Sequence, residues 1–264
     1  MDLLELIIEF HKEAKRQGPG SDEATMRALS FIPHSHEVSR ILDIGCGTGA
    51  QTLVLAQNTK ANITAVDMLP QFLEKLDEKI AYHNLGNRVV TKVMMMDNLS
   101  FAENFFDVIW SEGAIYNIGF EKGLSQWKKY LKDNGYIAVS EISWLTADRP
   151  AEIEQYWVNA YPEIDTVNRK LFILEKCGYI PVAHFVLDDS CWLNNYYNPI
   201  LERSEAFLEK HNYSAEAIEF IEAGRIEADM YTRFKEYFSY VFYIGKKRPG
   251  VFPCQDSPST CLTI

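Results

Sequence analysis

Short apolar runs alternate with amphipathic segments along the middle of the chain. Between the second and third runs, Phe72, Leu73, Leu76 and Ile80 recur every three or four residues, which is the spacing of one helix face. Strands that alternate with helices indicate βαβ units, which build a parallel sheet covered by helices on both faces. We therefore predict an open, doubly wound α/β sheet with five strands over residues 39–143. The apolar runs of these strands lie at 41–44, 63–66, 89–96, 108–110 and 137–139.

The pattern is looser beyond residue 143. A strand is expected at 179–187, and the β-branched and aromatic run at 238–244 suits a last strand. The whole sheet is therefore expected to have about seven strands. Helical spacing is found over 149–160, 166–177, 195–211 and 214–236.

The net charge of the chain limits the classes of partner that are expected. The 264 residues contain 26 lysines and arginines against 37 aspartates and glutamates, a formal net charge of −11. The longest basic run is Lys246-Lys247-Arg248. Affinity for nucleic acid comes largely from neutralising phosphates, so this surface argues against DNA, RNA and anionic membranes as partners.

The cysteines and apolar segments indicate a cytoplasmic setting. The five cysteines are odd in number and contain no CxxC spacing, so neither a disulfide framework nor a zinc site is expected. The acidic, briefly apolar amino terminus does not resemble a secretion signal, and no run approaches the ~18 apolar residues of a membrane span. The histidines show no metal-ligand spacing with carboxylates, so no metal is expected.

A glycine loop follows the first predicted strand. Gly45, Gly47 and Gly49 lie at alternate positions between that strand and a helix, where glycine lets the backbone turn sharply and lets a ligand approach closely. About twenty residues later, Asp67 ends the second strand, where a carboxylate can bind both hydroxyls of a ribose. This pattern indicates a nucleoside cofactor.

Two further features decide which nucleoside is expected, because Gly45-x-Gly47-x-x-Ala50 also fits a dinucleotide fingerprint. Asp43 lies inside the strand, where a buried acid needs hydrogen bonds or a cation. Asp97 lies at the predicted end of the third strand, in position to bind an adenine amino group. An NAD(P)-dependent oxidoreductase, which has no ready role for Asp97, and a non-catalytic cofactor-binding protein remain as alternatives.

A set of motifs occurs in fixed order over about residues 38–143. It consists of Asp43-x-Gly45-x-Gly47-x-Gly49, Asp67, Asp97, Phe106-Asp107-Val108-Ile109 and Asn134-Gly135-Tyr136. This order resembles class I S-adenosylmethionine-dependent methyltransferases. The segment from Trp110 to Gly119 makes the chain most similar to bacterial small-molecule methyltransferases of the ubiquinone/menaquinone-biosynthesis type.

The resemblance implies a Rossmann-like fold, a last strand antiparallel to the others, and S-adenosylmethionine as cofactor. The glycine loop would wrap the methionine part, Asp67 would hold the ribose, and Asp97 would flank the adenine. Asp43 would orient the loop or the ammonium group of the cofactor. The implied cofactor-binding residues are Asp43, Gly45, Cys46, Gly47, Gly49, Asp67, Met68, Met96, Asp97, Asn98 and Ser111.

The segment after the fourth strand faces the transferring methyl group in this family. It lacks the Asn/Asp-Pro-Pro-Tyr/Phe tetrapeptide of enzymes that methylate DNA bases or protein amides, so a small-molecule acceptor is expected. The catalytic candidates are Glu112 and Tyr116. Glu112 would act as a base or as an anchor for a cationic substrate. The alternative is that Glu112 only caps the following turn and Tyr116 only packs in the core. The substrate candidates are Glu141, Trp144, Tyr161, Trp192, Tyr196 and Tyr197.

We expect a single methyltransferase domain over residues 1–248, in which Gly18-Pro19-Gly20 hinges the first part. Whether the protein forms a homodimer, and whether the acceptor atom is nitrogen, oxygen or carbon, remains open from the sequence. The expected parts are a helical lid at 1–38, the cofactor-binding core at 39–143, a substrate-cover insertion with the sixth strand at 144–237, the last strand at 238–248, and a disordered tail at 249–264.

Overall fold

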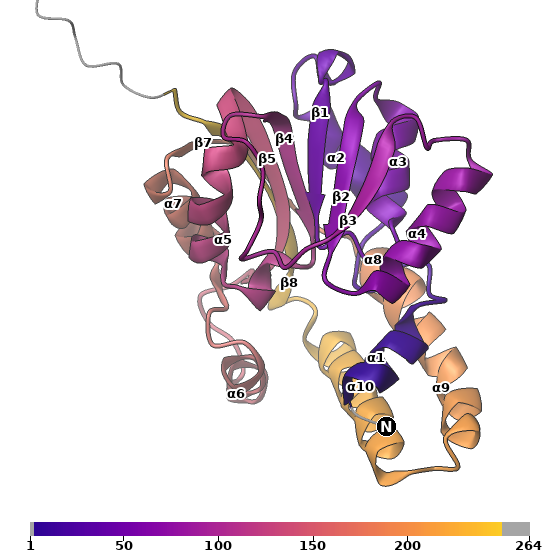
Figure 1. Cartoon of the computed structure of the whole chain (residues 1–264). Helices are drawn as coiled ribbons and strands as arrows, with labels where there is room; N and C mark the ends of the chain where they lie inside the picture. Colours follow the sequence, from indigo (N-terminus) through magenta and orange to yellow (C-terminus); the bar gives the residue numbers. More distant parts are fainter. Residues whose placement is uncertain (1–2, 250–264) are drawn as a thin grey trace, which may run out of the picture.

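One mixed sheet organises the computed structural model, which describes residues 3–249 (Figure 1). Its strand order is β3-β2-β1-β4-β5-β8-β7, with the two-residue β6 beside β5. β8 runs antiparallel to β5 and to β7, and the other pairs are parallel, which confirms the predicted doubly wound sheet and its antiparallel last strand. The strands are β1 (Arg40–Ile44), β2 (Asn62–Asp67), β3 (Val89–Val93), β4 (Phe106–Glu112), β5 (Leu131–Trp144), β6 (Asp165–Thr166), β7 (Tyr179–Val186) and β8 (Phe238–Lys247).

Helices cover both faces of the sheet, with α3 and α4 on one side of the view and α5 and α7 on the other (Figure 1). Alternation along β1 explains this: Ile41 packs with α2, α3 and α4, whereas Leu42 packs with α5 and α7. The helices of the two layers are α2 (Asp22–Ser30), α3 (Ala50–Asn58), α4 (Pro70–Tyr82), α5 (Phe120–Trp127) and α7 (Val167–Lys176).

A third group of helices lies beyond the carboxyl ends of the parallel strands (Figure 1). Phe10 on α1 packs edge-on against Phe207 on α9 and Phe220 on α10, with ring centroids 4.9 and 5.3 Å away. The amino-terminal segment and the insertion therefore form one cap. The remaining helices are α1 (Leu3–His11), α6 (Ala151–Ala160), α8 (Asp189–Trp192), α9 (Asn198–Lys210) and α10 (Ala215–Phe234), with short turns at Ser35–Glu37, Ile115–Asn117, Lys128–Tyr130 and Leu193–Tyr197.

The end of the third strand differs from the sequence prediction, and the predicted carboxyl-terminal tail cannot be compared with the structure. The third strand, predicted over 89–96, ends at Val93, and the chain continues into a turn. The predicted tail at 249–264 lies outside the described residues, apart from Pro249. Within residues 3–249, no helix combines the length and apolar character that crossing a bilayer requires.

Candidate cofactor and substrate site

A cavity of about 640 Å³ opens where the parallel strands end. Residues that follow or end β1, β2 and β4 line it, namely Gly45, Asp67 and Glu112. Other walls come from distant segments: Gln17 near the amino terminus and Phe220 on α10. The cavity lies at the switch point between β1 and β4, where ligands of such sheets bind, and its size is usual for small-molecule sites (about 300–1,000 Å³).

The loop after β1 depends on glycine at three positions. The φ angles of Gly45, Gly47 and Gly49 are 71°, 54° and 84°, in the left-handed region. A Cβ on Gly45 would lie 2.5 Å from Cβ of Ala114, and one on Gly47 would lie 2.4 Å from Oε1 of Gln17. Gly45 and Gly47 line the cavity, whereas Gly49 packs against α4 at the start of α3 and is absent from the lining.

Replacing Gly45 with alanine is expected to lower the free energy of unfolding by about 1–2 kcal/mol, because L residues are strained at positive φ and the methyl group would overlap Ala114. Gly18→Ala is the matched control. Gly18 also lines the cavity, but a Cβ there would meet no described atom within 4 Å outside its chain neighbours, and its φ is not positive. Urea unfolding compares the two variants. Equal stabilities would contradict the assignment of strain to the loop.

Asp67 connects the end of β2 to the glycine loop. Its two carboxylate oxygens accept hydrogen bonds from the backbone N–H groups of Gly47 at 2.9 Å and Leu69 at 3.0 Å. Burial raises the pKa of its carboxyl group. Each oxygen of a carboxylate can accept a second hydrogen bond, so Asp67 can still bind a pair of ligand hydroxyls.

Asp43 does not line the cavity, although a cofactor contact was one expectation for it. The side chain is fully buried beside α3, where Thr52 Oγ1 donates at 2.5 Å and Gln51 Nε2 donates at 3.2 Å. Burial raises the pKa of Asp43 to about 7. The geometry therefore favours the other expected role, in which Asp43 orients the loop by tying β1 to α3.

This pKa predicts a pH-dependent stability difference from the Asp43→Asn variant. Between about pH 4 and pH 7 folded Asp43 keeps a proton that the unfolded chain releases, so the wild type loses stability relative to the variant as the pH rises. From pH 5 to pH 7 the loss should be roughly 2 kcal/mol. Urea unfolding of both proteins at the two pH values measures it. A difference that stays constant with pH would contradict the raised pKa.

The adenine side of the expected site is only partly as predicted. Met68, Met96 and Asp97 line the cavity. Asp97 lies in the turn beyond β3 rather than in the strand, and Asn98 is exposed and does not line the cavity. Because β3 ends at Val93, these two residues lie in the turn that follows it, and of the two only Asp97 lines the cavity.

Cys46 and Ser111 also have different surroundings. Cys46 is buried in the loop and lines the cavity. Ser111 is fully buried and does not line it. Its hydroxyl donates a hydrogen bond to the carbonyl of Ile44 at 2.9 Å, so it joins β4 to β1 instead of contacting a ligand.

The amino-terminal segment is fastened onto the glycine loop. Gln17 and Thr48 exchange two hydrogen bonds: Nε2 of Gln17 donates to Oγ1 at 3.1 Å, and the backbone N–H of Thr48 donates to Oε1 at 2.9 Å. Lys79 on α4 donates to the carbonyl of Thr48 at 2.9 Å. Gln17 and its neighbours in this segment line the cavity.

Glu112 is held by three donors. Its Oε1 accepts from Thr25 Oγ1 at 2.6 Å and from Trp110 Nε1 at 2.9 Å, and its Oε2 pairs with Arg16 at 3.1 Å. The Arg16 and Glu112 side chains are each 5% exposed. A carboxylate so fully engaged is better suited to anchoring the amino-terminal segment over the cavity than to accepting a proton.

Of the remaining site candidates, Tyr116 and Tyr196 line the cavity. Trp144, Trp192 and Tyr197 do not line it, because their side chains are at most 3% exposed and belong to the sheet core. The expectation that these three form the substrate pocket is therefore corrected.

Glu141 and Tyr161 are also outside the cavity lining. Glu141 is fully buried on β5, where Lys170 donates to its Oε1 at 2.9 Å and the Tyr161 hydroxyl donates to the same atom at 2.6 Å. The Tyr161 ring lies edge-on to Tyr116, with centroids 6.0 Å apart. These residues support the wall behind Tyr116 rather than forming the surface of the cavity.

The expected lid at 1–38 includes α1, but the sequence did not single out the residues of this helix that line the cavity. Ile7 and His11 line the cavity, and their four-residue spacing places them on one helix face. Burial lowers the pKa of His11 to about 4, and its ring stacks on Tyr196 with centroids 6.5 Å apart. The four-residue spacing was a usable signal for a shared face, but it does not show which face of the lid helix turns toward the cofactor.

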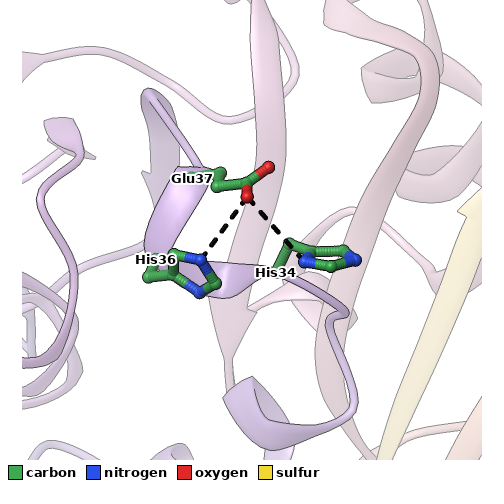
Figure 2. Close-up of side chains that lie close together, drawn as sticks. All are labelled: His34, His36 and Glu37. Carbon is green, nitrogen blue, oxygen red and sulfur yellow. Dashed lines mark ion pairs between the residues drawn. The ribbon is translucent and has the colours of Figure 1, made fainter.

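A second cluster of potential ligands lies away from the cavity, although no metal-ligand spacing was expected for the histidines. Figure 2 shows Glu37 between His34 and His36, with its Oε1 3.9 Å from Nδ1 of His34 and 3.5 Å from Nε2 of His36. All three side chains are about 70% exposed. They precede β1 at the sheet edge opposite the cavity, so they cannot take part in its chemistry.

The cavity fits an amino-acid-bearing nucleoside. Asp67 can take the vicinal hydroxyls of a ribose, and the glycine loop leaves room where a Cβ would fill the space. Arg16 Nε and His11 Nδ1 are buried and have no hydrogen-bond partner among residues 3–249. Both side chains line the cavity, so an acceptor such as a carboxylate could satisfy the arginine donor.

Comparison with known proteins agrees with this geometry. Residues 41–135 match the family model described as methyltransferase domain. Phosphoethanolamine N-methyltransferase of Plasmodium falciparum is 27% identical over 213 residues, which cover 78% of this chain and 75% of that protein. The C-methyltransferase UbiE of Geotalea daltonii is 30% identical over 121 residues, 45% of this chain and only half of that relative.

A solved structure shows the same fold. A methyltransferase from Geobacter sulfurreducens, in complex with S-adenosyl-L-homocysteine, superposes with a TM-score of 0.79 at 17% identity, covering 92% of this chain and 98% of that one. The family match and the relatives account for the cofactor core, and the superposition extends the likeness to the cap. The chain belongs to the class I S-adenosylmethionine-dependent methyltransferases, with S-adenosylmethionine as its cofactor.

Proposed function

We propose that this enzyme methylates a small molecule bound between the Glu112–Asn117 segment and the cap. One observation carries the proposal: the glycine loop and Asp67 line the same continuous cavity as Tyr116 and Tyr196. A single cavity that holds cofactor determinants at one side and an aromatic wall at the other has space for two reactants. The catalytic role of Tyr116 is to position the acceptor.

Specific residues are proposed to hold the cofactor. Gly45, Cys46 and Gly47 would surround its methionine part, and Asp67 would bind its ribose. Met68, Met96 and Asp97 would flank its adenine. When bound, S-adenosylmethionine supplies a methyl group that is already activated by the positive charge on sulfur.

The chain then has mainly to position the acceptor and exclude water. α1 and α10 close the cavity with Ile7, His11 and Phe220. Tyr116 as a residue is 40% exposed, but desolvation of its hydroxyl at the cavity raises the pKa of that group, so the hydroxyl stays protonated near neutral pH and can donate a hydrogen bond. One relative is named as an N-methyltransferase and another as a C-methyltransferase. Their names therefore do not decide which atom accepts the methyl group in this enzyme.

The first test is calorimetric titration with S-adenosylhomocysteine, followed by assay of methyl transfer from labelled S-adenosylmethionine to small-molecule extracts. Binding with one site per chain is the expected result. Heat only with NAD or NADP would contradict the proposed cofactor use. Binding without transfer to any small molecule would favour a non-catalytic role.

The cellular location and the partners of the enzyme are also proposals. Cys46, Cys177 and Cys191 are buried free thiols among the described residues, which supports a reducing, cytoplasmic location. The net charge of −11 supports a partner other than nucleic acid or an anionic membrane. Sedimentation of the purified protein would decide between a monomer and a homodimer.

A further inference from the structure

Two histidines and a glutamate come together in the connection between α2 and β1. His34, His36 and Glu37 belong to the short turn that precedes the first strand. Figure 2 shows that a nitrogen of each imidazole points to the same carboxylate oxygen of Glu37. One potential ligand atom of each side chain lies within 4.8 Å of the other two. Within residues 3–249, no other three His, Cys, Asp or Glu side chains bring their ligand atoms this close together.

The separations of these atoms are near those of a metal centre. Ligand atoms at about 2.0–2.1 Å from a tetrahedral zinc ion lie about 3.3–3.4 Å from one another. Here Oε1 of Glu37 lies 3.5 Å from Nε2 of His36 and 3.9 Å from Nδ1 of His34. The three side chains are largely exposed, so rotation about their χ angles can close the remaining difference without disturbing the core.

The backbone keeps the three side chains in this arrangement. The N–H of Glu37 donates a hydrogen bond to the carbonyl of His34 at 2.7 Å, which closes the turn. Both flanks of the turn are fixed to the domain: Ile32 is buried in the core, and the backbone N–H of Arg40 donates to Oδ2 of Asp107 at 2.9 Å. Because the turn is already ordered, a ligand that binds there loses less free energy to the ordering of the chain.

The donor atoms select the class of ion. Imidazole nitrogen suits zinc, nickel, copper and iron, whereas magnesium and calcium prefer oxygen ligands. Two imidazoles and one carboxylate leave a fourth position of a tetrahedral ion for water. The net charge of −11 also favours the approach of cations to the surface of the chain.

The ordinary interpretation of the cluster is a pair of surface ion pairs. Glu37 would then attract each histidine only when the imidazole is protonated, and exposed pairs of this kind contribute little to stability. A bound cation differs because it neutralises the carboxylate while both imidazoles stay uncharged. The two interpretations are therefore separated by one measurable property, which is the affinity of the cluster for a metal ion.

We propose that His34, His36 and Glu37 bind a divalent transition-metal ion, with Zn²⁺ as the expected ion and water at the open position. The site lies at the amino end of β1, whereas the cofactor cavity opens at the carboxyl ends of the parallel strands. The ion therefore has a structural role, in which it cross-links the turn that connects α2 to β1. This inference is independent of the proposed methyl transfer.

Calorimetric titration of the untagged full chain with ZnCl₂ tests the site. The wild type should bind one Zn²⁺ per chain with a micromolar dissociation constant, and MgCl₂ should not bind. Loss of an outer-shell partner typically lowers metal affinity by about 10–100-fold, so loss of a ligand in His34→Ala or His36→Ala should lower it by at least about tenfold. His83→Ala, at an exposed histidine outside the cluster, is the matched control and should keep the wild-type affinity.

Two further measurements identify the ligands and show that the variants are folded. Co²⁺ at this site should give ligand-field absorption bands without the thiolate charge-transfer band that cysteine ligands produce. Excess Zn²⁺ should raise the melting temperature of the wild type but not that of the His34→Ala/His36→Ala double variant. In the presence of EDTA the two proteins should melt at the same temperature, which shows that the double variant is folded.

Three results would overturn the metal site. The first is the absence of Zn²⁺ binding to the wild type at millimolar concentration. The second is equal Zn²⁺ affinity in the wild type and the double variant, and the third is a thiolate charge-transfer band that persists in the double variant. Either of the last two would assign the bound metal to other residues. None of these results affects the proposed binding of S-adenosylmethionine, because the cavity does not include the turn.

Discussion

Replacing Asp67 with alanine is expected to weaken S-adenosylhomocysteine binding by about 100-fold. The carboxylate accepts the N–H groups of Gly47 and Leu69 and is proposed to accept the ribose hydroxyls as well. Hydrogen bonds to a charged group contribute about 1.5–3 kcal/mol each, and 1.4 kcal/mol corresponds to a factor of ten. Loss of the ligand contacts, together with loosening of the glycine loop, therefore accounts for a roughly 100-fold loss of affinity for S-adenosylhomocysteine. Calorimetric titration measures the change.

Three variants sharpen this test. Asp67→Asn keeps one acceptor oxygen and should lie between wild type and alanine. Glu78→Ala removes an exposed acid on α4 and should leave the affinity unchanged. Glu112→Ala should lose less affinity than Asp67→Ala, since Glu112 contacts the amino-terminal segment rather than the loop. Similar losses for Asp67→Ala and Glu112→Ala would contradict the separate roles.

The cofactor half of the molecule could be predicted from the sequence because its signals are local. Gly45 and Gly47 directly follow a strand, and Asp67 ends the next one, so the parallel sheet brings them to one edge. The antiparallel last strand was also predictable, but only through the family resemblance. Periodicity alone cannot give the direction of a strand, because residues alternate between faces in either direction.

The aromatic half could not be predicted in the same way. Tyr196 and Tyr197 are neighbours in sequence, yet one lines the cavity and the other is buried in the core. They lie in a π-helical turn at Leu193–Tyr197, which shifts the phase of the helix. A 3.6-residue repeat cannot assign faces across such a turn. Aromatic character and position in the insertion therefore made Trp144 and Trp192, which pack in the core, candidates equal to Tyr196.

Glu227 on α10, whose Oε1 accepts a hydrogen bond from the Tyr197 hydroxyl at 2.9 Å, shows the same limit over a longer range. In the sequence it is one of several acids on a long amphipathic helix, where a solvated face is the ordinary interpretation. Only the packing of α10 beside Tyr197 distinguishes it from exposed neighbours such as Glu219. Contacts of this kind depend on how the cap packs against the sheet. That packing is determined jointly by residues of α1, α9 and α10.

The pairing of Glu112 with Arg16 is a further long-range contact, and it predicts a strong coupling in a double-mutant cycle. Arg16→Met and Glu112→Gln should each lower the free energy of unfolding by about 3 kcal/mol, because removing one partner of a buried pair leaves the other charge uncompensated. Asp22 also contacts Arg16, which keeps the expected loss at the low end of the usual range. Urea unfolding of the four proteins gives the coupling energy.

The double variant should be more stable than the sum of the single losses predicts, by at least about 1.5 kcal/mol, since neither charge then remains unpaired. Additivity within about 0.5 kcal/mol would show that the contact is not an interacting pair. Each single variant should also release S-adenosylhomocysteine faster in a stopped-flow displacement experiment, because Arg16 and Gln17 line the cavity from the segment that Glu112 anchors. A matched control is Lys15→Met, at a position whose side chain is 76% exposed, and it should leave the release rate unchanged. Because Arg16 can also contact the ligand directly, the decisive comparison is Glu112→Gln with Lys15→Met: faster release in Glu112→Gln but not in Lys15→Met is the result expected if the buried ion pair, rather than the general charge of the amino-terminal segment, keeps the cover closed over the cofactor.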